Sequence, residues 1–159
     1  MYKATRLFIA ERQKFCRTEL SVVKVVQVGG GKPNDCTNNA LDATEAGDEV
    51  RTITGWLVHP YNSLSDSTEI VQHWWNMRSD GTYFDTSPEI GDECEYVKDM
   101  DLIHYFAKNS DRIDNNVALS LILFNGIFIG VDQDASSSSG IRRLKISSLE
   151  TEVLYRHKP

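Results

Sequence analysis

Residues 70–86 read IVQHWWNMRSDGTYFDT, and this stretch decides the fold that the sequence predicts. The segment 70–77 is rich in β-branched and aromatic residues, which favour an extended strand. A turn follows at residues 79–81 (Ser-Asp-Gly), and residues 82–86 supply a returning strand of the same character. The stretch therefore predicts an antiparallel β-hairpin.

The length of the turn decides which side chains share one face of this hairpin. A two-residue loop would place Asn76 opposite Asp85, and His73 would then face away from Asp85. A three-residue loop with Gly81 in the left-handed position places Trp75 opposite Asp85, so that His73 and Asp85 become diagonal neighbours on one face. Because the three-residue loop favours glycine at its third position, we predict this second register and a contact between His73 and Asp85.

Cys36 begins a second informative segment, upstream of the hairpin. The glycine run at 29–31 breaks the preceding chain, and Asp35 is a good helix N-cap. We therefore expect a helix over residues 36–46 that ends before Gly47. The sulfur would lie in the first helical turn, where free amides and the helix dipole favour a thiolate and can stabilise an oxyanion. A free cysteine is also commonly a small buried apolar residue, so the segment alone leaves both interpretations open.

Together, Cys36, His73 and Asp85 form a candidate nucleophile, base and orienting acid. Asp85 would hold the imidazole in the tautomer that leaves its other nitrogen free for Cys36. The expected chemistry is attack of a thiolate on a carbonyl carbon, with a thioester intermediate. The same three residues are possible zinc ligands, with His59 as a fourth, but zinc sites usually take two ligands from one short motif. No such motif is present, and we expect neither a metal nor another cofactor.

The order of these motifs resembles the transglutaminase-like, papain-fold cysteine hydrolases, in particular their small bacterial and phage relatives. The matching segments, within residues 27–88, are Cys36 with Asn39, residues 55–58 (Gly-Trp-Leu-Val), residues 73–76 (His-Trp-Trp-Asn) and residues 80–86 (DGTYFDT). The resemblance implies a papain-like core in which a cysteine on a helix faces a histidine on a strand, and a group on the next strand completes the triad. It also implies hydrolysis, deamidation or acyl transfer on a peptide, protein or small amide substrate.

The sequence departs from this family at the group that would bind the oxyanion. Papain-like enzymes carry a glutamine a few residues before the cysteine, whereas Gln27 lies nine positions upstream of Cys36. We expect Gln27, Asn38, Asn39 or backbone amides to take this role. Trp75 is a candidate wall of the substrate cleft, and core packing of both Trp74 and Trp75 is the favoured alternative. The alternative function is a non-catalytic binding or sequestering protein on the same fold.

The composition of the 159-residue chain fits one globular domain, 1–159. A hydrophobic content of 40% argues against disorder. The formal net charge is −6, and no stripe of lysine or arginine is present, which argues against nucleic acid as the main partner. The three cysteines are widely spaced and suggest no disulfide framework, so Cys16 and Cys94 are expected to be structural thiols.

The chain shows no pattern typical of secretion or membrane insertion. The first residues lack the apolar run of a signal peptide, and the longest apolar stretch, 117–131, is too short and too interrupted to span a bilayer. We therefore expect a cytoplasmic protein without a membrane partner. The sequence makes no prediction of oligomeric state.

Local patterns predict the remaining elements. They are strands over 4–10, 20–28, 50–58 and 93–98, a helix over 99–108, a hairpin within 117–129 that turns at Asn125 and Gly126, a loop at 135–140, and the start of a C-terminal helix at 148–153. The expected fold class is α+β, with an antiparallel sheet packed on an N-terminal helix that carries Cys36.

Overall fold

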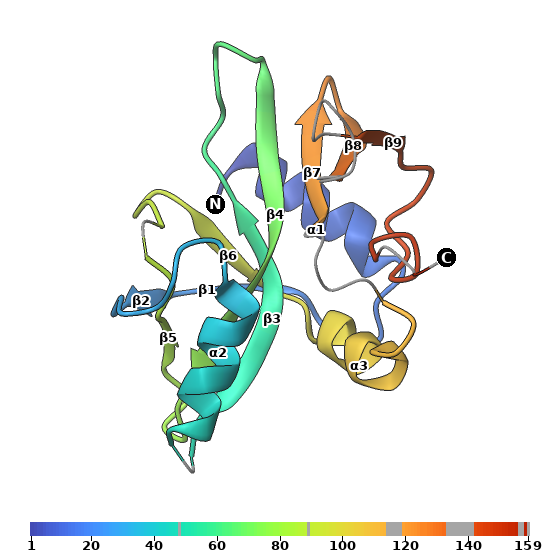
Figure 1. The fold of residues 1–159 in the computed structure, drawn as a ribbon. Helices are drawn as coiled ribbons and strands as arrows, with labels where there is room; N and C mark the ends of the chain where they lie inside the picture. Colours follow the sequence, from blue (N-terminus) through green and yellow to red (C-terminus); the bar gives the residue numbers. More distant parts are fainter. Residues whose placement is uncertain (48, 89, 114–118, 133–141, 156–157, 159) are drawn as a thin grey trace.

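The computed structural model describes residues 1–47, 49–88, 90–113, 119–132, 142–155 and 158. Over these residues it has mixed α and β structure, in which helices pack on one large, mostly antiparallel sheet (Figure 1). The helices are α1 (Lys3–Gln13), α2 (Cys36–Glu45) and α3 (Met100–Asn109). The strands are β1 (Ser21–Val23), β2 (Val25–Gln27), β3 (Arg51–Val58), β4 (Ser67–Met77), β5 (Tyr83–Asp85), β6 (Glu95–Lys98), β7 (Leu119–Phe124), β8 (Ile127–Asp132) and β9 (Arg142–Lys145).

Strands β3 and β4 form the centre of the sheet and pair over the whole length of β3. The long strand β4 serves two neighbours: its first half pairs with β7, and its last residues pair with β5. Strands β7, β8 and β9 extend the sheet on one side, and β6 followed by β1 extends it on the other. The predicted antiparallel sheet is therefore present, and its one parallel pair is β2 with β5 among the described strands.

The segment 21–27 joins two distant parts of this sheet. Strand β1 pairs with β6, whereas β2, which follows after the single residue Lys24, pairs with β5. Strand β6 is a neighbour of β3, and β5 is a neighbour of β4. The segment therefore crosses from one side of the central β3–β4 pair to the other. This crossing places Gln27 directly beside Asp85 in the parallel ladder.

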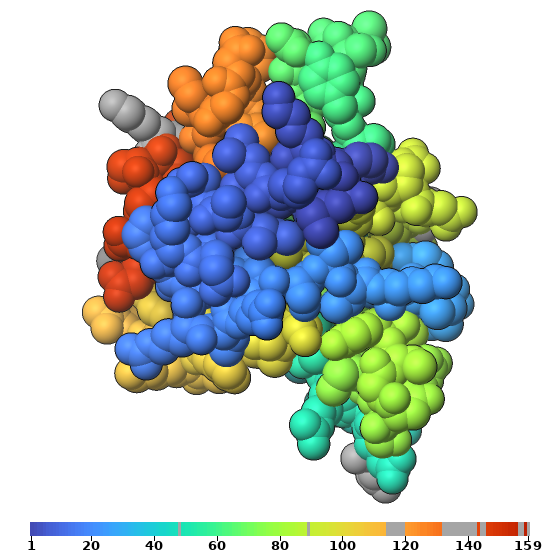
Figure 2. All heavy atoms as spheres, turned by 180° about the vertical axis from the view of Figure 1, so that it is seen from behind, coloured from blue at the N-terminus to red at the C-terminus, as the bar shows by residue number. Residues whose placement is uncertain are grey.

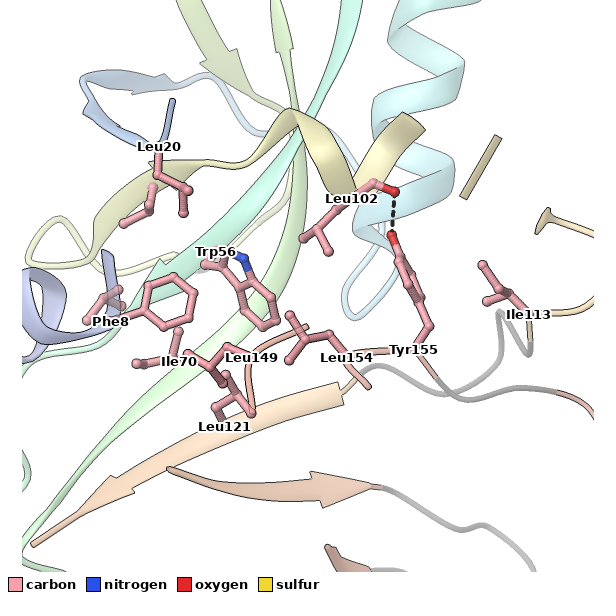
Figure 3. Packing of buried hydrophobic residues seen from close by; sticks show 12 residues of the cluster. Phe8, Leu20, Trp56, Ile70, Leu102, Ile113, Leu121, Leu149, Leu154 and Tyr155 are labelled. Carbon is pink, nitrogen blue, oxygen red and sulfur yellow. Dashed lines mark hydrogen bonds between the residues drawn. The ribbon is translucent and has the colours of Figure 1, made fainter. Parts of the chain in front are cut away.

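Side chains alternate along β3 and divide between two hydrophobic cores. Trp56 and Val58 belong to the larger core, which Figure 3 shows packed between the sheet, α3 and the C-terminal segment. Ile53 and Leu57 belong to a smaller core that also contains Trp75. Figure 2 shows α1 and the residues that follow it covering the back of the molecule.

A buried ion pair connects α1 to the residue between β6 and α3. The Arg12 Nε lies 2.8 Å from Oδ2 of Asp99, and both side chains are fully buried. The indole of Trp56 donates to the same carboxylate oxygen at 3.0 Å. Arg12 also donates to the carbonyl of Leu149 and to the hydroxyl of Thr151, so it anchors the C-terminal segment as well.

Helix α2 packs on the centre of the sheet, as predicted for the cysteine-bearing helix. The side-chain amide of Asn76 on β4 donates to the carbonyl of Ala40 at 2.8 Å, and the hydroxyls of Thr44 and Thr52 lie 2.8 Å apart. The helix ends at Glu45 with Ala46 as its C-cap, close to the predicted boundary.

The hairpin predicted from residues 70–86 is confirmed in its register. Asn76 pairs with Phe84 and Met77 pairs with Tyr83. The amide of Arg78 donates to the carbonyl of Thr82 at 2.9 Å, which leaves the three residues 79–81 in the loop. Gly81 has a φ of 83°, the left-handed conformation that this loop requires.

Two predicted elements are wrong. Residues 4–10 belong to α1 rather than to a strand, and the buried face of this helix is formed by Thr5, Phe8 and Arg12, whose spacing is helical. The C-terminal helix expected at 148–153 is a series of turns. In this conformation the carbonyl of Leu149 and the hydroxyl of Thr151 both accept hydrogen bonds from Arg12. The cysteine helix is consequently the second helix, not the N-terminal one.

The other predicted elements correspond to strands and helices of the structure with small changes of boundary. Residues 20–28 contain β1 and β2, 50–58 contain β3, 93–98 contain β6, 99–108 match α3, and the hairpin at Asn125 and Gly126 is β7–β8. The loop expected at 135–140 lies outside the described residues. In the described part of the chain, no helix combines the length and the apolar character that crossing a bilayer requires.

Candidate active site

The structure brings His73 and Asp85 together across the β4–β5 hairpin. Nε2 of His73 lies 2.5 Å from Oδ2 of Asp85, and both side chains are buried. This contact confirms the geometry predicted from the three-residue turn. Because Nε2 is engaged by Asp85, Nδ1 is the ring nitrogen left for a second partner.

That second partner is Cys36, the first residue of α2. After Asp85, it is the group whose hydrogen bonding and charge raise the pKa of the His73 imidazole. Cys36 is partly exposed, whereas His73 and Asp85 are 4% and 1% exposed. The nucleophile candidate is thus the accessible member of the group, and the base and acid lie behind it.

The start of α2 leaves backbone donors next to Cys36. Asp35 occupies the N-cap position, but its side chain does not bond to the helix amides. Its Oδ1 instead accepts a hydrogen bond from the side chain of Asn38 at 2.7 Å. The amides of the first turn therefore keep their hydrogen-bonding capacity, which suits them to an oxyanion.

The electrostatics of the pair favour an imidazolium beside a carboxylate. Burial lowers the pKa of His73, but hydrogen bonds to Asp85 and Cys36, together with their charges, outweigh it and raise the pKa to about 9. Burial raises the pKa of Asp85, whereas donors and charge from His73, Ser87 and Tyr96 hold it below its ordinary value. At neutral pH, His73 is therefore the cationic neighbour that a thiolate needs.

Aromatic rings fix the orientation of His73. Trp75 stacks on the imidazole with centroids 6.2 Å apart, and Tyr96 meets it edge-on at 5.9 Å. Trp75 is fully buried, so it packs against the base and does not wall a substrate cleft as expected. Strand alternation places Trp75 on the same face as His73, inside the smaller core, which confirms the alternative of core packing for this residue.

Gly55 makes this packing possible. It lies opposite His73 on β3, where a Cβ would lie 2.0 Å from the carbonyl oxygen of Val97 and 2.7 Å from the ring of Trp75. A larger residue would displace the strand or the indole that supports the base. The Gly-Trp pair of the motif is therefore explained by close packing.

The amide side chains expected at the oxyanion are engaged in other contacts. Asn39 accepts from the amide of Lys32 at 2.9 Å and donates to its carbonyl at 2.8 Å, so it ties the glycine loop to α2. Gln27 donates to the hydroxyl of Tyr96, and Asn38 binds the residue before the helix. The first-turn amides of α2 remain as the group best placed to bind an oxyanion.

Tyr96 is a residue of the site that the sequence did not indicate. Its hydroxyl donates to Oδ2 of Asp85 at 2.8 Å. No local pattern singles it out, because its place depends on the pairing of β6 with β3. Its contact with Gln27 joins residues that are 69 positions apart in the chain.

The other two cysteines are in environments that keep them protonated. Burial, with the charge of Asp99 close by, raises the pKa of Cys16 to about 12. Burial, followed by the charge of Glu93, also raises the pKa of Cys94, whose Sγ lies 3.5 Å from Nδ1 of His59. This pairing was not foreseen, and it places His59 with Cys94 instead of with the Cys36 group. Among the described residues, no cluster of three or more His, Cys, Asp or Glu side chains could hold a metal.

Comparison with known proteins gives no family for this chain. It matches no protein-family model, no curated protein and no solved structure. The resemblance to transglutaminase-like enzymes therefore rests on the order of the motifs alone, and the functional argument rests on the geometry of the site.

Proposed function

We propose that this protein is a cysteine-dependent hydrolase or acyltransferase in which Cys36 is the nucleophile, His73 the proton carrier and Asp85 the orienting acid. The observation that carries the proposal is the double engagement of His73. Its imidazole binds Asp85 through Nε2 at 2.5 Å and has Cys36 as its other partner. A buried base held between an acid and a partly exposed thiol is the arrangement that thiol acyl transfer requires.

The reaction follows from these positions. The Cys36 thiolate attacks a carbonyl carbon, an S–C bond forms, and the first-turn amides of α2 hold the resulting oxyanion. The His73 imidazolium gives its proton to the leaving amine or alcohol as the bond to that group breaks, which leaves a thioester. Water or an amine then attacks the thioester, His73 takes the proton, and Cys36 leaves as a thiolate. Asp85 keeps its charge throughout and holds the ring in place.

The substrate class in this proposal comes from the family resemblance. It implies an amide bond in a peptide, a protein or a small molecule, with water or an amine as the acceptor. The same resemblance leads us to propose a papain-like core for the fold, and the sequence patterns lead us to propose a cytoplasmic location for the protein.

Covalent labelling of the thiol tests the proposal. The protein is treated with iodoacetamide across a range of pH, and alkylation of each cysteine is followed by peptide mass spectrometry. At neutral pH, Cys36 should react at least about tenfold faster than Cys16 or Cys94, because it is beside the protonated His73, whereas burial and nearby carboxylates raise the pKa of the other two thiols. His73→Ala should remove most of this advantage. The matched control His59→Ala changes the other cysteine–histidine pair and should leave the rate at Cys36 unchanged.

A generic ester then tests acyl transfer itself. With para-nitrophenyl acetate, the parent protein should release nitrophenolate and carry one acetyl group on Cys36, and Cys36→Ala should show neither. Equal alkylation at all three cysteines, with no acetylation of Cys36, would rule out the nucleophile and favour the non-catalytic binding protein.

A further inference from the structure

The acid of the candidate triad accepts hydrogen bonds from two side chains. Oδ2 of Asp85 accepts from His73 at 2.5 Å and from the Tyr96 hydroxyl at 2.8 Å, while Oδ1 accepts from the amide of Ser87 at 2.7 Å. Tyr96 and His73 thus share one carboxylate oxygen. Any change in the bond from Tyr96 acts directly on the bond that orients the base.

The direction of the hydrogen bonds follows from the chemistry of the groups. The Nε2 of Gln27 can only donate, so the oxygen of Tyr96 accepts from it. The Tyr96 hydroxyl has a single proton, and the Asp85 carboxylate can only accept. Gln27 therefore fixes the tyrosine proton on the side of Asp85. Gln27 therefore donates to Tyr96, Tyr96 donates to Asp85, and Asp85 also accepts from His73.

The fold builds this set of hydrogen bonds from four separate strands, β2, β4, β5 and β6. Gln27 comes from β2, which lies beside β5 only because the segment 21–27 crosses the sheet. Tyr96 comes from β6, is 5% exposed, and packs its ring edge-on against both His73 and Trp75. Burial, with the charge of Asp85, raises the pKa of Tyr96, so its hydroxyl remains a donor at every pH at which the site would work.

We propose that Tyr96, oriented by Gln27, is a positioning residue of the site, which sets the strength and direction of the Asp85–His73 hydrogen bond. This proposal rests on the proposed function for its catalytic meaning. Its physical content is separate, because it predicts a property of His73 that is measurable whether or not Cys36 reacts.

The test is a titration of His73 by NMR in protein with ¹³C-labelled histidine. In Tyr96→Phe, Oδ2 of Asp85 loses one donor, so more of its negative charge acts on the imidazolium. The pKa of His73 should rise by about 0.5 or more. The matched control is Tyr155→Phe, which removes another buried hydroxyl, one that donates to the carbonyl of Leu102 at 2.9 Å. The control should leave the titration of His73 unchanged.

Thiol labelling supplies the second readout. Tyr96→Phe should slow alkylation of Cys36 at neutral pH by about three- to tenfold, because the base is less firmly oriented. Gln27→Met keeps Tyr96 and should change both readouts in the same direction by a smaller amount, which preserves the test if Tyr96→Phe does not fold. A His73 titration that is the same in the parent, Tyr96→Phe and Gln27→Met would overturn the proposal, as would an equal change in Tyr155→Phe. If the titration moves but Cys36 is unreactive in the parent, the proposed function fails and the positioning contact stands.

Discussion

Replacing His73 with glutamine should remove a pH-dependent part of the stability of this protein. On folding, His73 gains Asp85 and Cys36 as partners, and its pKa rises from 6.5 to about 9. A group whose pKa is higher in the folded state stabilises the fold fully below its unfolded pKa. That contribution is lost as the pH rises through the folded pKa. The contribution of His73 is therefore complete below about pH 6.5 and absent well above about pH 9.

The size of the effect follows from the same two values. A rise in pKa from 6.5 to about 9 corresponds to about 3 kcal/mol of preference for the protonated form in the folded state. His73 is only 4% exposed, so solvent screens this interaction little. The loss is large beside the roughly 5–15 kcal/mol by which most domains are stable.

Urea unfolding between about pH 6 and pH 10 measures this contribution. The quantity to compare is the difference in free energy of unfolding between the parent and His73→Gln, because the other titrating groups act on both proteins. This difference should shrink by about 3 kcal/mol across the range. His104→Gln, at an exposed position of α3, is the matched control for the loss of a histidine outside the site.

A parent–variant difference that stays constant across the range would refute the reasoning, since it would mean that His73 has the same pKa in both states. Cys36→Ala separates the two sources of the effect. The hydrogen bond and the charge of Cys36 both raise the pKa of His73. Cys36→Ala should therefore lower the pKa of His73 in the folded state, so the stability that His73 contributes is lost over a narrower pH range. The part of the pKa rise that comes from Asp85 should remain.

Two further substitutions test the scaffold around the site. Arg12→Met should lower the free energy of unfolding, measured with urea, by about 3–5 kcal/mol, because it leaves the buried carboxylate of Asp99 without its cation. The control Lys14→Met removes an exposed ion pair and should change the free energy of unfolding by less than about 1 kcal/mol. Gly55→Ala should lower the melting temperature strongly because its Cβ would lie 2.0 Å from a carbonyl oxygen of β6, while Gly91→Ala meets only the flexible side chain of Glu93 at 3.3 Å. Similar melting temperatures for these two variants would contradict the close packing at β3.

The parts of the site that the sequence predicted depend on local rules. The register of the β4–β5 hairpin follows from one loop length and one glycine, and it determined that His73 and Asp85 share a face. The helix that carries Cys36 follows from a glycine run, an N-cap residue and a terminating glycine. Both signals lie within a few residues of the feature that they specify.

The parts that the sequence did not predict depend on pairing between distant segments. Gln27 reaches Tyr96 because β1 pairs with β6 whereas β2, on the same segment, pairs with β5. No local pattern within residues 21–27 predicts that the two strands have different neighbours. Helix α1 was missed for a related reason. Its buried face includes Thr5 and Arg12, which are hidden by contacts with β6 and with the residues around it, so the apolar pattern is weak.

The described part of the chain contains two buried ion pairs, and the difference between them is the physical ground for proposing a function for one of them. A buried pair is weak evidence for stability, since well-packed apolar residues often replace it without loss. Arg12 and Asp99 are fully enclosed and bind groups from several segments, and the thiol of Cys16 beside them is held protonated. That pair joins parts of the fold.

His73 and Asp85 are arranged differently. The carboxylate accepts from three donors, and the imidazole also interacts with the thiol of Cys36, which solvent can reach. An ion pair that only joined strands would not need a histidine that also interacts with a thiol, whereas a catalytic base must have a ring nitrogen available for its nucleophile. Groups with strongly shifted pKa values beside an accessible nucleophile are typical of active sites. The proposed thiol chemistry therefore accounts together for the charge of His73, the exposure of Cys36 and the free amides of α2.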